Sequence, residues 1–594
     1  MTRMDDPGAS RPVAQPVATF APLGVPAYRL IWSAALVSNL GTFLQLTAAP
    51  WLMNELTRSP LLVALVTTAL TLPRLLLTLP AGALADVVDR RTLLLSGQVI
   101  SATAVGVMAV LTAVEMMTPL LLLGLSFALG TGSAIALPSF QTLVPDLVPR
   151  PLMAQAITLN SASFNVARSV GPALGGVLVG AGLASAAFGA NAISFLAVIG
   201  VLLSFPRSTV EDPARQTLWR STALGLRYAR FTQPIRILLV VTALFALTTA
   251  GVQALLPVVS EDLGLGGAGF GVLYGLFGAG ALTAAMTRER IRSVAGARLL
   301  PGAMLAFGVA GIAFGLARIP VAAGAALIVA GLSWVWTLTT LNASIQLLAP
   351  RWVRGRVVSL YLLAIGLQPV GAFAAGAIAE ATGAGVAVAM STAGTVALGL
   401  VAMRLRLPVL GELDEPQAPE DWVVPRHAKQ VGGSPILVAT TWEIDLDDAP
   451  EFFAVMRQLR RQRFRTGAHR WSLYRDVDRP QRITEFFGVH DWAEHLAQHA
   501  RIDREAAAVL QRALAFDRRG GPSTRHLAGL DVVDGDALPL EEQLLTIHEE
   551  FHRRDGSVPL DRDGADEAPD PLDVEAAVPD VHDGSVPPDR GERT

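Results

Sequence analysis

The stretch Gly82-Ala-Leu-Ala-Asp86-Val-Val-Asp89-Arg90-Arg91 lies between two long apolar segments of a 594-residue chain. It places two acidic and two basic side chains in a short connection, just where an apolar run ends. Gly82 allows two helices to approach closely, and Asp86 can cap the following helix or pair with an arginine. Arg90 and Arg91 are typical of a loop on the cytoplasmic side of a membrane. The stretch therefore predicts two membrane helices joined by a charged cytoplasmic loop.

The composition of the chain is that of a membrane protein with soluble parts. Hydrophobic residues make up 52% of the sequence and charged residues only 16%, whereas an average soluble domain carries about 25% charge. The net charge of −3 provides no basic field for nucleic acid, so we expect no such partner. The absence of cysteine excludes disulfides, thiolate metal ligands and cysteine nucleophiles. Residues 1–26 lack an apolar core of the kind a cleaved signal peptide needs, so none is expected.

Apolar segments long enough to cross a bilayer, about 20 residues each, recur along the first two thirds of the sequence. The expected spans are 30–53, 60–84, 92–114, 119–140, 154–179, 184–205, 235–259, 268–287, 299–317, 320–348, 357–379 and 384–404. A polar, arginine-rich stretch divides them into two groups of six. We therefore predict an all-α membrane protein with twelve transmembrane helices in two six-helix bundles, followed by a cytoplasmic α+β domain.

The placement of arginine predicts how the chain is oriented in the membrane. With the N-terminus inside, the inner connections carry nearly all arginines, and the outer loops hold only Arg58 and Arg318. Both termini are therefore expected in the cytoplasm. The triplet Gly82-Ala-Leu recurs as Gly280-Ala-Leu in the second group of spans, which indicates a duplicated six-helix unit. Two such bundles are expected to rock about a mid-membrane site.

The domain organisation follows from these changes of composition. We expect a cytoplasmic N-terminal segment 1–27, a first bundle 28–206, a central loop 207–234, a second bundle 235–406, a linker 407–434, a soluble domain 435–530 and an acidic tail 531–594. The order of expected elements in the soluble domain is β-α-β-β-α-β, which predicts a ferredoxin-like fold. The tail is rich in Asp, Glu, Pro and Gly, which predicts a mostly disordered segment with a candidate helix at 540–553.

The fifth span contains Asn165-Val-Ala-Arg168-Ser-Val-Gly171-Pro172-Ala-Leu-Gly175-Gly176. Its second half resembles the G-P-x-x-G-G motif of antiporters in the major facilitator superfamily. Small residues on one face allow tight helix contact, and Pro172 frees a backbone carbonyl and permits a bend. The motif is interpreted either as a hinge and seal of an exporter or as plain helix packing.

Two arginines lie inside expected spans. Arg74 precedes Asp86 by 12 residues, about 18 Å along a helix, and Arg168 lies one turn before Gly171. An arginine in mid-membrane costs about 2.5–3.5 kcal/mol on insertion scales, so it should face a cavity or a partner. The two open interpretations are attraction of an anionic substrate, such as a carboxylate or catecholate, and a structural pair with dipoles or a carboxylate.

Carboxylates are scarce inside the spans, so no proton relay is visible in the sequence. Glu380 is the candidate for a coupling carboxylate, because proton antiport needs a group that titrates as access alternates. The uncharged candidates for contact with substrate or coupling ion are Asn39, Gln45, Asn342 and Gln346. Trp334 in the tenth span is interpreted as lipid contact or packing rather than as a stacking platform for an aromatic ligand.

The soluble domain contains Trp492-Ala-Glu494-His495-Leu-Ala-Gln-His499, with histidines one helical turn apart. Glu494 precedes His495, so the pattern is not the H-E-x-x-H signature of zinc enzymes. We therefore expect a solvated or dimer-facing helix, no metal site, no cofactor and no catalytic residue.

Taken together, these segments resemble the transmembrane secretion effector family of the major facilitator superfamily. The resemblance rests on Ser38-Asn-Leu-Gly41, Leu79 to Asp86, Asn165 to Pro172, Gly331-Leu-Ser-Trp334, Gln346 to Arg356 and Gly467 to Trp471. The family includes relatives of the enterobactin exporter. The resemblance implies a secondary transporter, not an enzyme, that exports siderophore- or antibiotic-like molecules across the bacterial inner membrane, with protons as coupling ion.

The soluble domain resembles the antibiotic-biosynthesis monooxygenase fold, whose members form dimeric α+β barrels. This resemblance implies a homodimer through the C-terminal domain. Two other functions stay open at this point: a transporter fused to a cofactor-free monooxygenase-like enzyme domain, and a transporter-derived receptor. Similarity of fold does not by itself confer an activity.

Overall fold

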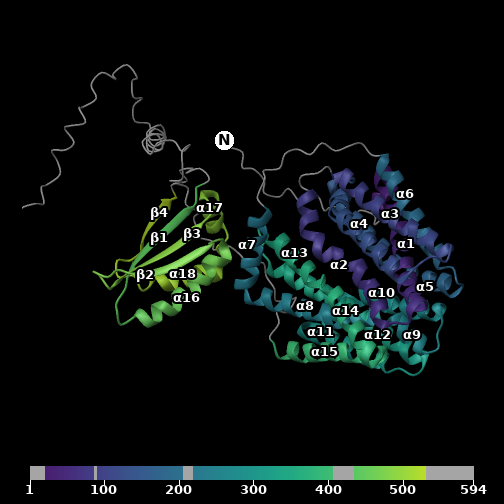
Figure 1. Cartoon of the computed structure of the whole chain (residues 1–594). Helices are drawn as coiled ribbons and strands as arrows, with labels where there is room; N and C mark the ends of the chain where they lie inside the picture. Colours follow the sequence, from purple (N-terminus) through teal and green to yellow (C-terminus); the bar gives the residue numbers. More distant parts are fainter. Residues whose placement is uncertain (1–19, 86–89, 205–217, 406–433, 530–594) are drawn as a thin grey trace, which may run out of the picture. The chain divides into compact units, whose positions relative to one another are not determined.

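The computed structural model describes residues 20–85, 90–204, 218–405 and 434–529. Among the described residues, the elements up to Arg404 are all helices, and a four-stranded sheet with three helices begins at residue 436 (Figure 1). The expected tail and its candidate helix at 540–553 lie outside the described residues.

The first half of the helical part contains six long helices and two 3₁₀ turns. Their bounds are η1 Ala21–Gly24, α1 Pro26–Thr57, α2 Pro60–Ala85, α3 Arg90–Ala113, α4 Pro119–Asp146, η2 Arg150–Leu152, α5 Met153–Gly180 and α6 Ala184–Leu203. The helix α7 Leu218–Phe231 lies between the two halves of the sequence. The second half consists of α8 Gln233–Ala254, α9 Leu256–Asp262, α10 Gly267–Ala295, η3 Gly296–Arg298, α11 Leu299–Gly315, α12 Pro320–Leu348, α13 Arg354–Ile365, α14 Gln368–Thr382 and α15 Ala384–Arg404.

Within the described residues, 11 segments are long and apolar enough to cross a membrane. They coincide with the expected spans except the fifth, which forms α5, a helix of 28 residues that is not among the 11. Polar residues such as Gln155, Asn160 and Arg168 lower the hydropathy of α5. A mostly helical multi-pass membrane part is thus confirmed, whereas the number twelve stays a prediction.

Proline interrupts one expected span of the second half. The segment expected at 357–379 is divided into α13 and α14, which begins with Gln368 and Pro369. Proline is tolerated in the first turn of a helix, where its missing N–H has no partner to lose. The two pieces still count as one apolar crossing, Arg354–Thr382.

The C-terminal part is a four-stranded antiparallel sheet of order β2-β3-β1-β4. Its elements are β1 Ile436–Glu443, α16 Ala449–Thr466, β2 Arg470–Arg475, β3 Arg482–Val489, α17 Trp492–Ala500, α18 Arg504–Leu514 and β4 Ser523–Ala528. Alternate residues of β1 are buried, as a strand with one covered face requires. Trp442 of β1 and Phe452 of α16 are fully buried in the core between the sheet and the helices.

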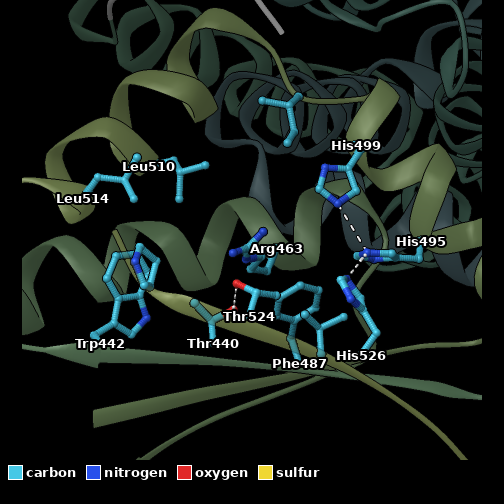
Figure 2. Close-up of a pocket in the computed structure, with 13 residues that line it drawn as sticks. Thr440, Trp442, Arg463, Phe487, His495, His499, Leu510, Leu514, Thr524 and His526 are labelled. Carbon is cyan, nitrogen blue, oxygen red and sulfur yellow. Dashed lines mark hydrogen bonds between the residues drawn. The ribbon is translucent and has the colours of Figure 1, made fainter. Parts of the chain in front are cut away.

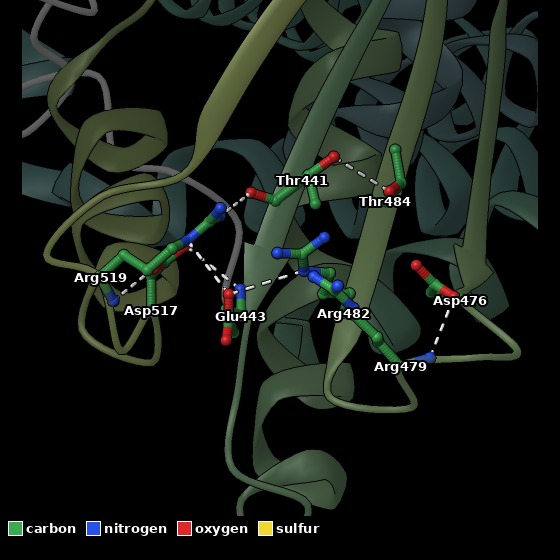
Figure 3. A network of polar contacts seen from close by, with 8 residues as sticks. All are labelled: Thr441, Glu443, Asp476, Arg479, Arg482, Thr484, Asp517 and Arg519. Atoms are coloured by element: carbon green, nitrogen blue, oxygen red, sulfur yellow. Dashed lines mark hydrogen bonds and ion pairs between the residues drawn. The ribbon is translucent and has the colours of Figure 1, made fainter. Parts of the chain in front are cut away.

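One end of this sheet is held by polar contacts (Figure 3). Glu443 of β1 lies 3.7 Å from Arg482 of β3 and 3.7 Å from Arg519, which follows α18. Arg519 also donates to the backbone carbonyl of Thr441 at 2.6 Å. The hydroxyls of Thr441 and Thr484 are 3.1 Å apart across the strand pair. These contacts fix the ends of β1 and β3 and the segment that leads into β4.

The expectation of a solvated or dimer-facing helix is wrong for α17. His495 is 2% exposed and Gln498 is 1% exposed, and the helix packs against β3. The helix α17 is short and amphipathic, and its opposite face carries charged and small residues. Its histidine face therefore packs toward the sheet. Within the described residues, no group of three or more His, Asp or Glu side chains has an arrangement that could hold a metal ion.

Candidate functional site

The charged loop from Gly82 to Arg91 is described only in part. Asp86 and Asp89 lie outside the described residues, and only the helical backbone is described for Gly82 and Arg90. Arg91 donates from Nε to the carbonyl of Leu202 at 3.0 Å and from Nη2 to that of Leu203 at 2.9 Å. These carbonyls close the C-terminus of α6, where a cation is favourable. Arg91 therefore ties the start of α3 to the end of α6.

The glycines of the fifth-span motif lie in two different helix contacts. A Cβ on Gly171 would meet Cβ of Phe43 at 2.5 Å, and one on Gly175 would meet Cβ of Thr47 at 3.0 Å. Both neighbours belong to α1 of the same half. Gly171 and Gly175 therefore allow α5 to pack closely within its own bundle.

Gly176 makes the contact between the two halves of the molecule. A Cβ on Gly176 would lie 2.2 Å from Cα of Gly271 in α10, and one on Gly271 would lie 2.3 Å from Cα of Gly176. One turn further, a Cβ on Gly180 would meet the nitrogen of Ala268 at 2.6 Å. Only glycine fits at Gly176 and Gly271, because the two backbones touch directly.

We call the end of the helical part that carries the connections after α1, α3, α5, α11 and α14 end A. Two polar contacts join the halves there. The Glu380 carboxylate of α14 accepts a hydrogen bond from the Ser59 hydroxyl at 2.9 Å and one from the backbone N–H of Leu61 at 3.2 Å. The Asn54 amide of α1 donates to the Glu261 carboxylate of α9. Polar contacts and glycine packing thus close end A between the two halves.

Arg74 faces away from the lipid side of α2. Because successive residues of a helix turn by about 100°, Arg74 lies roughly opposite Leu76, which is 56% exposed. Thr67, Thr71 and Arg74 fall on one stripe at helical spacing. On one side of this stripe the backbone at Leu70 touches α4, and on the other Thr68 donates to the carbonyl of Pro369 in α14 at 3.1 Å. The polar stripe therefore faces the space between the two halves.

Arg168 of α5 has the same relation to its helix. It lies two residues from both Val166 and Val170, which are 48% and 44% exposed, and so points to the opposite side. Its guanidinium carbon stands 4.2 Å from the ring centre of Trp334 in α12. This cation–π contact joins the two halves, and no carboxylate contacts Arg168 among the described residues.

The three side chains lie at a common depth. Arg168 is 12 residues before the end of α5, about 18 Å from end A. Arg74 and Trp334 are each 14 residues after the start of their helices, about 21 Å from the same end. The structure therefore brings the two predicted arginines and Trp334 to the middle of the membrane part, on surfaces that face the other half.

The uncharged candidates have different surroundings. Gln45 is 1% exposed, donates to Sδ of Met108 at 3.1 Å and accepts from Asn191 at 2.7 Å, so it packs inside the first half. Gln346 donates to Asn342 at 2.7 Å along one face of α12. Asn39 is partly exposed, and the side chain of Asn165 lies outside the described residues.

Gly267 and Gly271 of α10, the partners of the fifth-span glycines, were not among the predicted site residues. The signal was present, because Gly176 and Gly180 are spaced as a G-x-x-x-G pair and so are Gly267 and Gly271. Trp334 was expected to contact lipid or to serve in packing, and in the structure its ring makes a cation–π contact with the Arg168 guanidinium.

The 11 candidate spans among the described residues define a multi-pass membrane protein. A family model described as "Transmembrane secretion effector" matches residues 17–530, and the chain belongs to this family. The prediction that the chain is a transporter and not an enzyme is confirmed at the level of its family and relatives.

Its relatives include exporters. The chain is 28% identical over 411 residues to the multidrug efflux pump Tap of Mycolicibacterium fortuitum, which covers 65% of this chain and 96% of the relative. It is 23% identical over 351 residues to the Staphyloferrin A transporter of Staphylococcus aureus, which covers 58% of this chain and 87% of the relative. The relatives are named for efflux and for transport of a siderophore, so the expected transport function is confirmed at this level.

Solved structures show the same fold for the helical part. A bacterial homologue of the human lysosomal transporter Spinster, in an inward-facing and unoccupied conformation, gives a TM-score of 0.53 at 16% identity and covers 65% of this chain and 98% of its own. The nucleoside transporter NupG (D323A mutant) gives a TM-score of 0.54 at 13% identity, with coverages of 64% and 99%. The helical part therefore has the fold of these transporters.

Proposed function

We propose that this protein exports small anionic organic molecules, siderophore- or antibiotic-like, across the bacterial cytoplasmic membrane by alternating access. The observation that carries the proposal is the Arg168–Trp334 contact at mid-membrane depth. Arg168 comes from one half and Trp334 from the other, so a ligand that binds between them contacts both halves.

The charge of the substrate follows from the cost of Arg168. A mid-membrane arginine costs about 2.5–3.5 kcal/mol on insertion scales. The cation–π contact with Trp334 offsets about 2 kcal/mol or more of this cost, but it leaves the positive charge of Arg168 in place. No carboxylate neutralises Arg168 among the described residues. A planar guanidinium suits a carboxylate or catecholate, and the Trp334 ring suits an aromatic substrate. The names of the relatives, a Staphyloferrin A transporter and a multidrug efflux pump, support a siderophore- or antibiotic-like substrate.

In the proposed orientation end A faces the outside and both termini lie in the cytoplasm. The helix α5 also crosses the membrane, which brings the number of spans to twelve. Arg58 and Arg318 are the arginines of the connections at end A, whereas the connections at the other end are rich in arginine. The contacts that close end A would then form the outer gate, and the structure would be the state in which that gate is shut.

We assign proton coupling to Glu380. Its carboxylate accepts hydrogen bonds across the two halves from Ser59 and Leu61, at the N-terminus of α2. Protonation from the outside would remove the negative charge that the helix dipole of α2 favours. The outer gate would then open more readily, as exchange of substrate for protons requires.

We infer further that the segments 1–27, 28–206, 207–234, 235–406, 407–434, 435–530 and 531–594 are the units of the chain. The strand order β2-β3-β1-β4 supports a ferredoxin-like fold for the soluble domain. Its sheet has one open face, where Tyr474 is 59% exposed, Leu527 47% and Leu437 37%. We propose that this face joins a second copy of the domain in a homodimer.

The test is transport by Arg168→Gln, Arg168→Lys and Trp334→Leu in an efflux-deficient bacterial host. Accumulation of anionic and cationic compounds is measured with and without an uncoupler, at matched protein levels in the membrane. We expect Arg168→Gln to raise accumulation of anionic substrates to the level of the empty host, and Arg168→Lys to restore export in part. Trp334→Leu should weaken export of aromatic substrates most.

The matched control is Arg318→Gln, which removes an exposed arginine from a connection at end A. It should leave export unchanged. Full export of anionic compounds by Arg168→Gln would refute the assigned role of Arg168. Export of nothing by the wild type, despite correct insertion, would refute the transport direction.

A further inference from the structure

The soluble domain contains a cavity of about 300 Å³ between its sheet and its helices (Figure 2). Folded interiors contain few voids larger than a water molecule, and small-molecule sites begin at about 300 Å³. The strands direct alternate residues into this space. Val438, Thr440 and Trp442 of β1 line it. Three residues opposite them line it too, because opposite residues of an antiparallel pair share a face: His526 and Thr524 of β4 and Phe487 of β3.

One end of the cavity is apolar. Trp442 lies there below Leu510 and Leu514 of α18 (Figure 2). These side chains form a slot that suits a flat apolar group. The hydroxyls of Thr440 and Thr524, which are 3.3 Å apart, lie midway along the cavity.

The other end consists of three histidines. Nε2 of His495 lies 3.0 Å from Nε2 of His526 in β4 and 3.3 Å from Nε2 of His499, one turn further along α17. Arg463 lines the cavity nearby, but its guanidinium makes two hydrogen bonds to the buried carboxylate of Glu485, at 3.1 and 3.3 Å. Arg463 is therefore already paired with a carboxylate of the protein.

The three imidazoles are uncharged near neutral pH. Burial, the neighbouring histidines and the Arg463 guanidinium lower the pKa of His495 to about 3. Burial and Arg463 lower the pKa of His499 to about 4, and burial lowers that of His526. A neutral imidazole has one donor and one acceptor nitrogen.

Only one of the two contacts at the centre of this cluster can be a hydrogen bond within the cluster. The central Nε2 of His495 carries either one proton or one lone pair, yet it faces two ring nitrogens at hydrogen-bond distance. A hydroxyl group of a ligand can accept from one imidazole and donate to another, so it suits this cluster. A carboxylate cannot donate, and an ammonium group cannot accept.

We propose that this cavity binds a small uncharged aromatic compound that carries a hydroxyl group, with its ring in the slot beside Trp442 and its hydroxyl among His495, His499 and His526. The soluble domain is then a second binding site for small molecules, separate from the mid-membrane site. The proposal depends on neither the direction nor the coupling of transport.

The test is calorimetric titration of the full-length protein in lipid nanodiscs with 2-naphthol. Leu510→Trp and Leu514→Trp fill the slot, and His526→Phe removes one hydroxyl partner. We expect each variant to weaken binding of 2-naphthol at least tenfold. The control is Val477→Trp, at a 91% exposed position between β2 and β3 that does not line the cavity. It should bind 2-naphthol as the wild type does, and it accounts for partition of 2-naphthol into lipid.

Two further ligands test the chemistry. 2-Methoxynaphthalene keeps the rings but cannot donate a hydrogen bond, and naphthalene-2-sulfonate replaces the hydroxyl by an anion. Both should bind at least tenfold more weakly than 2-naphthol. Equal binding of 2-naphthol and 2-methoxynaphthalene, or saturable binding of Zn²⁺ that His526→Phe abolishes, would overturn the proposal.

Hydrogen exchange of the wild-type protein tests the site without any variant, and so also when a variant fails to fold. In the wild type, 2-naphthol should slow exchange in α17 and β4, and leave exchange in the membrane helices unchanged. An unchanged exchange rate in α17 and β4 at saturating 2-naphthol would refute the site without any variant.

Discussion

The contact between Gly176 and Gly271 predicts that one methyl group opens end A. In Gly176→Ala the new Cβ would lie 2.2 Å from Cα of Gly271, whereas ordinary contact begins at 3.4 Å. The helices α5 and α10 must therefore separate by at least about 1.2 Å. The facing atoms are backbone, so no side-chain rotation relieves the overlap.

The size of the effect follows from the cost of overpacking. One extra methyl group in a close contact costs about 1–3 kcal/mol. Because this contact exists only while end A is closed, the cost falls on the closed state alone. The ratio of closed to open molecules should fall by about 5- to 150-fold.

The assay is electron–electron distance measurement between spin labels at end A. The natural chain contains no cysteine, so labels at Met116→Cys and Ile319→Cys need no altered background. These positions lie in the connections after α3 and α11, one in each half. We expect Gly176→Ala to add a population with a longer distance.

The control variant is Gly189→Ala in α6, where a new Cβ would meet nothing within 4 Å. It makes the same substitution in a membrane helix, so it accounts for the higher helix propensity of alanine. If Gly176→Ala and Gly189→Ala give the same distance distribution as the wild type, the glycine contact does not hold end A closed.

Two further predictions concern charged and titratable groups. Glu380→Gln should raise the population that is open at end A about two- to fivefold, because an exposed anion at a helix N-terminus contributes about 0.3–1 kcal/mol. The same spin-label distance measurement checks this prediction. An equal effect of the control variant Glu55→Gln would contradict it. The pKa of His495 is lowered from 6.5 to about 3, so the unfolded state binds its proton first, and stability falls as pH drops below 6.5. At about pH 5 the loss of folding stability from His495 is about 2 kcal/mol. It should speed hydrogen exchange of the β1 and β3 amides, after correction for the intrinsic exchange rate. His495→Phe should remove most of this pH dependence, and an unchanged pH dependence in the variant would refute the role of His495.

The course of the chain was predictable because membrane helices are specified by local composition. A run of about 20 apolar residues has one stable conformation in a bilayer, so span positions follow from the sequence. The succession of strands and helices along the soluble domain was predictable from residue alternation and turn residues, which are local as well. The fifth segment was also predictable as a helix, since 154–179 forms α5, but Arg168 and its neighbours lower its hydropathy and it is not among the 11 candidate spans of the described residues.

The partners of the candidate residues were not predictable, because they come from distant helices. The residues around Gly176 in the sequence do not indicate that it contacts Gly271. The residues around Arg168 likewise do not indicate that it contacts Trp334. The histidines show the same limit. The pair His495 and His499 is visible as a helical repeat, but His526 joins them only through the register of β4 against β1.

The positions of the two arginines argue for a shared role rather than two separate accidents. Arg74 and Arg168 lie on different helices, yet each is opposite the lipid-facing stripe of its helix and each is about 20 Å from end A. A structural arginine needs only one local partner, and that need does not fix its depth. A substrate that spans the space between the halves does fix it, because both cations must reach the same ligand. We therefore expect Arg74→Gln and Arg168→Gln to weaken export of one and the same set of anionic compounds. The double variant should be little worse than either alone, and different substrate sets for the two single variants would show that the arginines act separately.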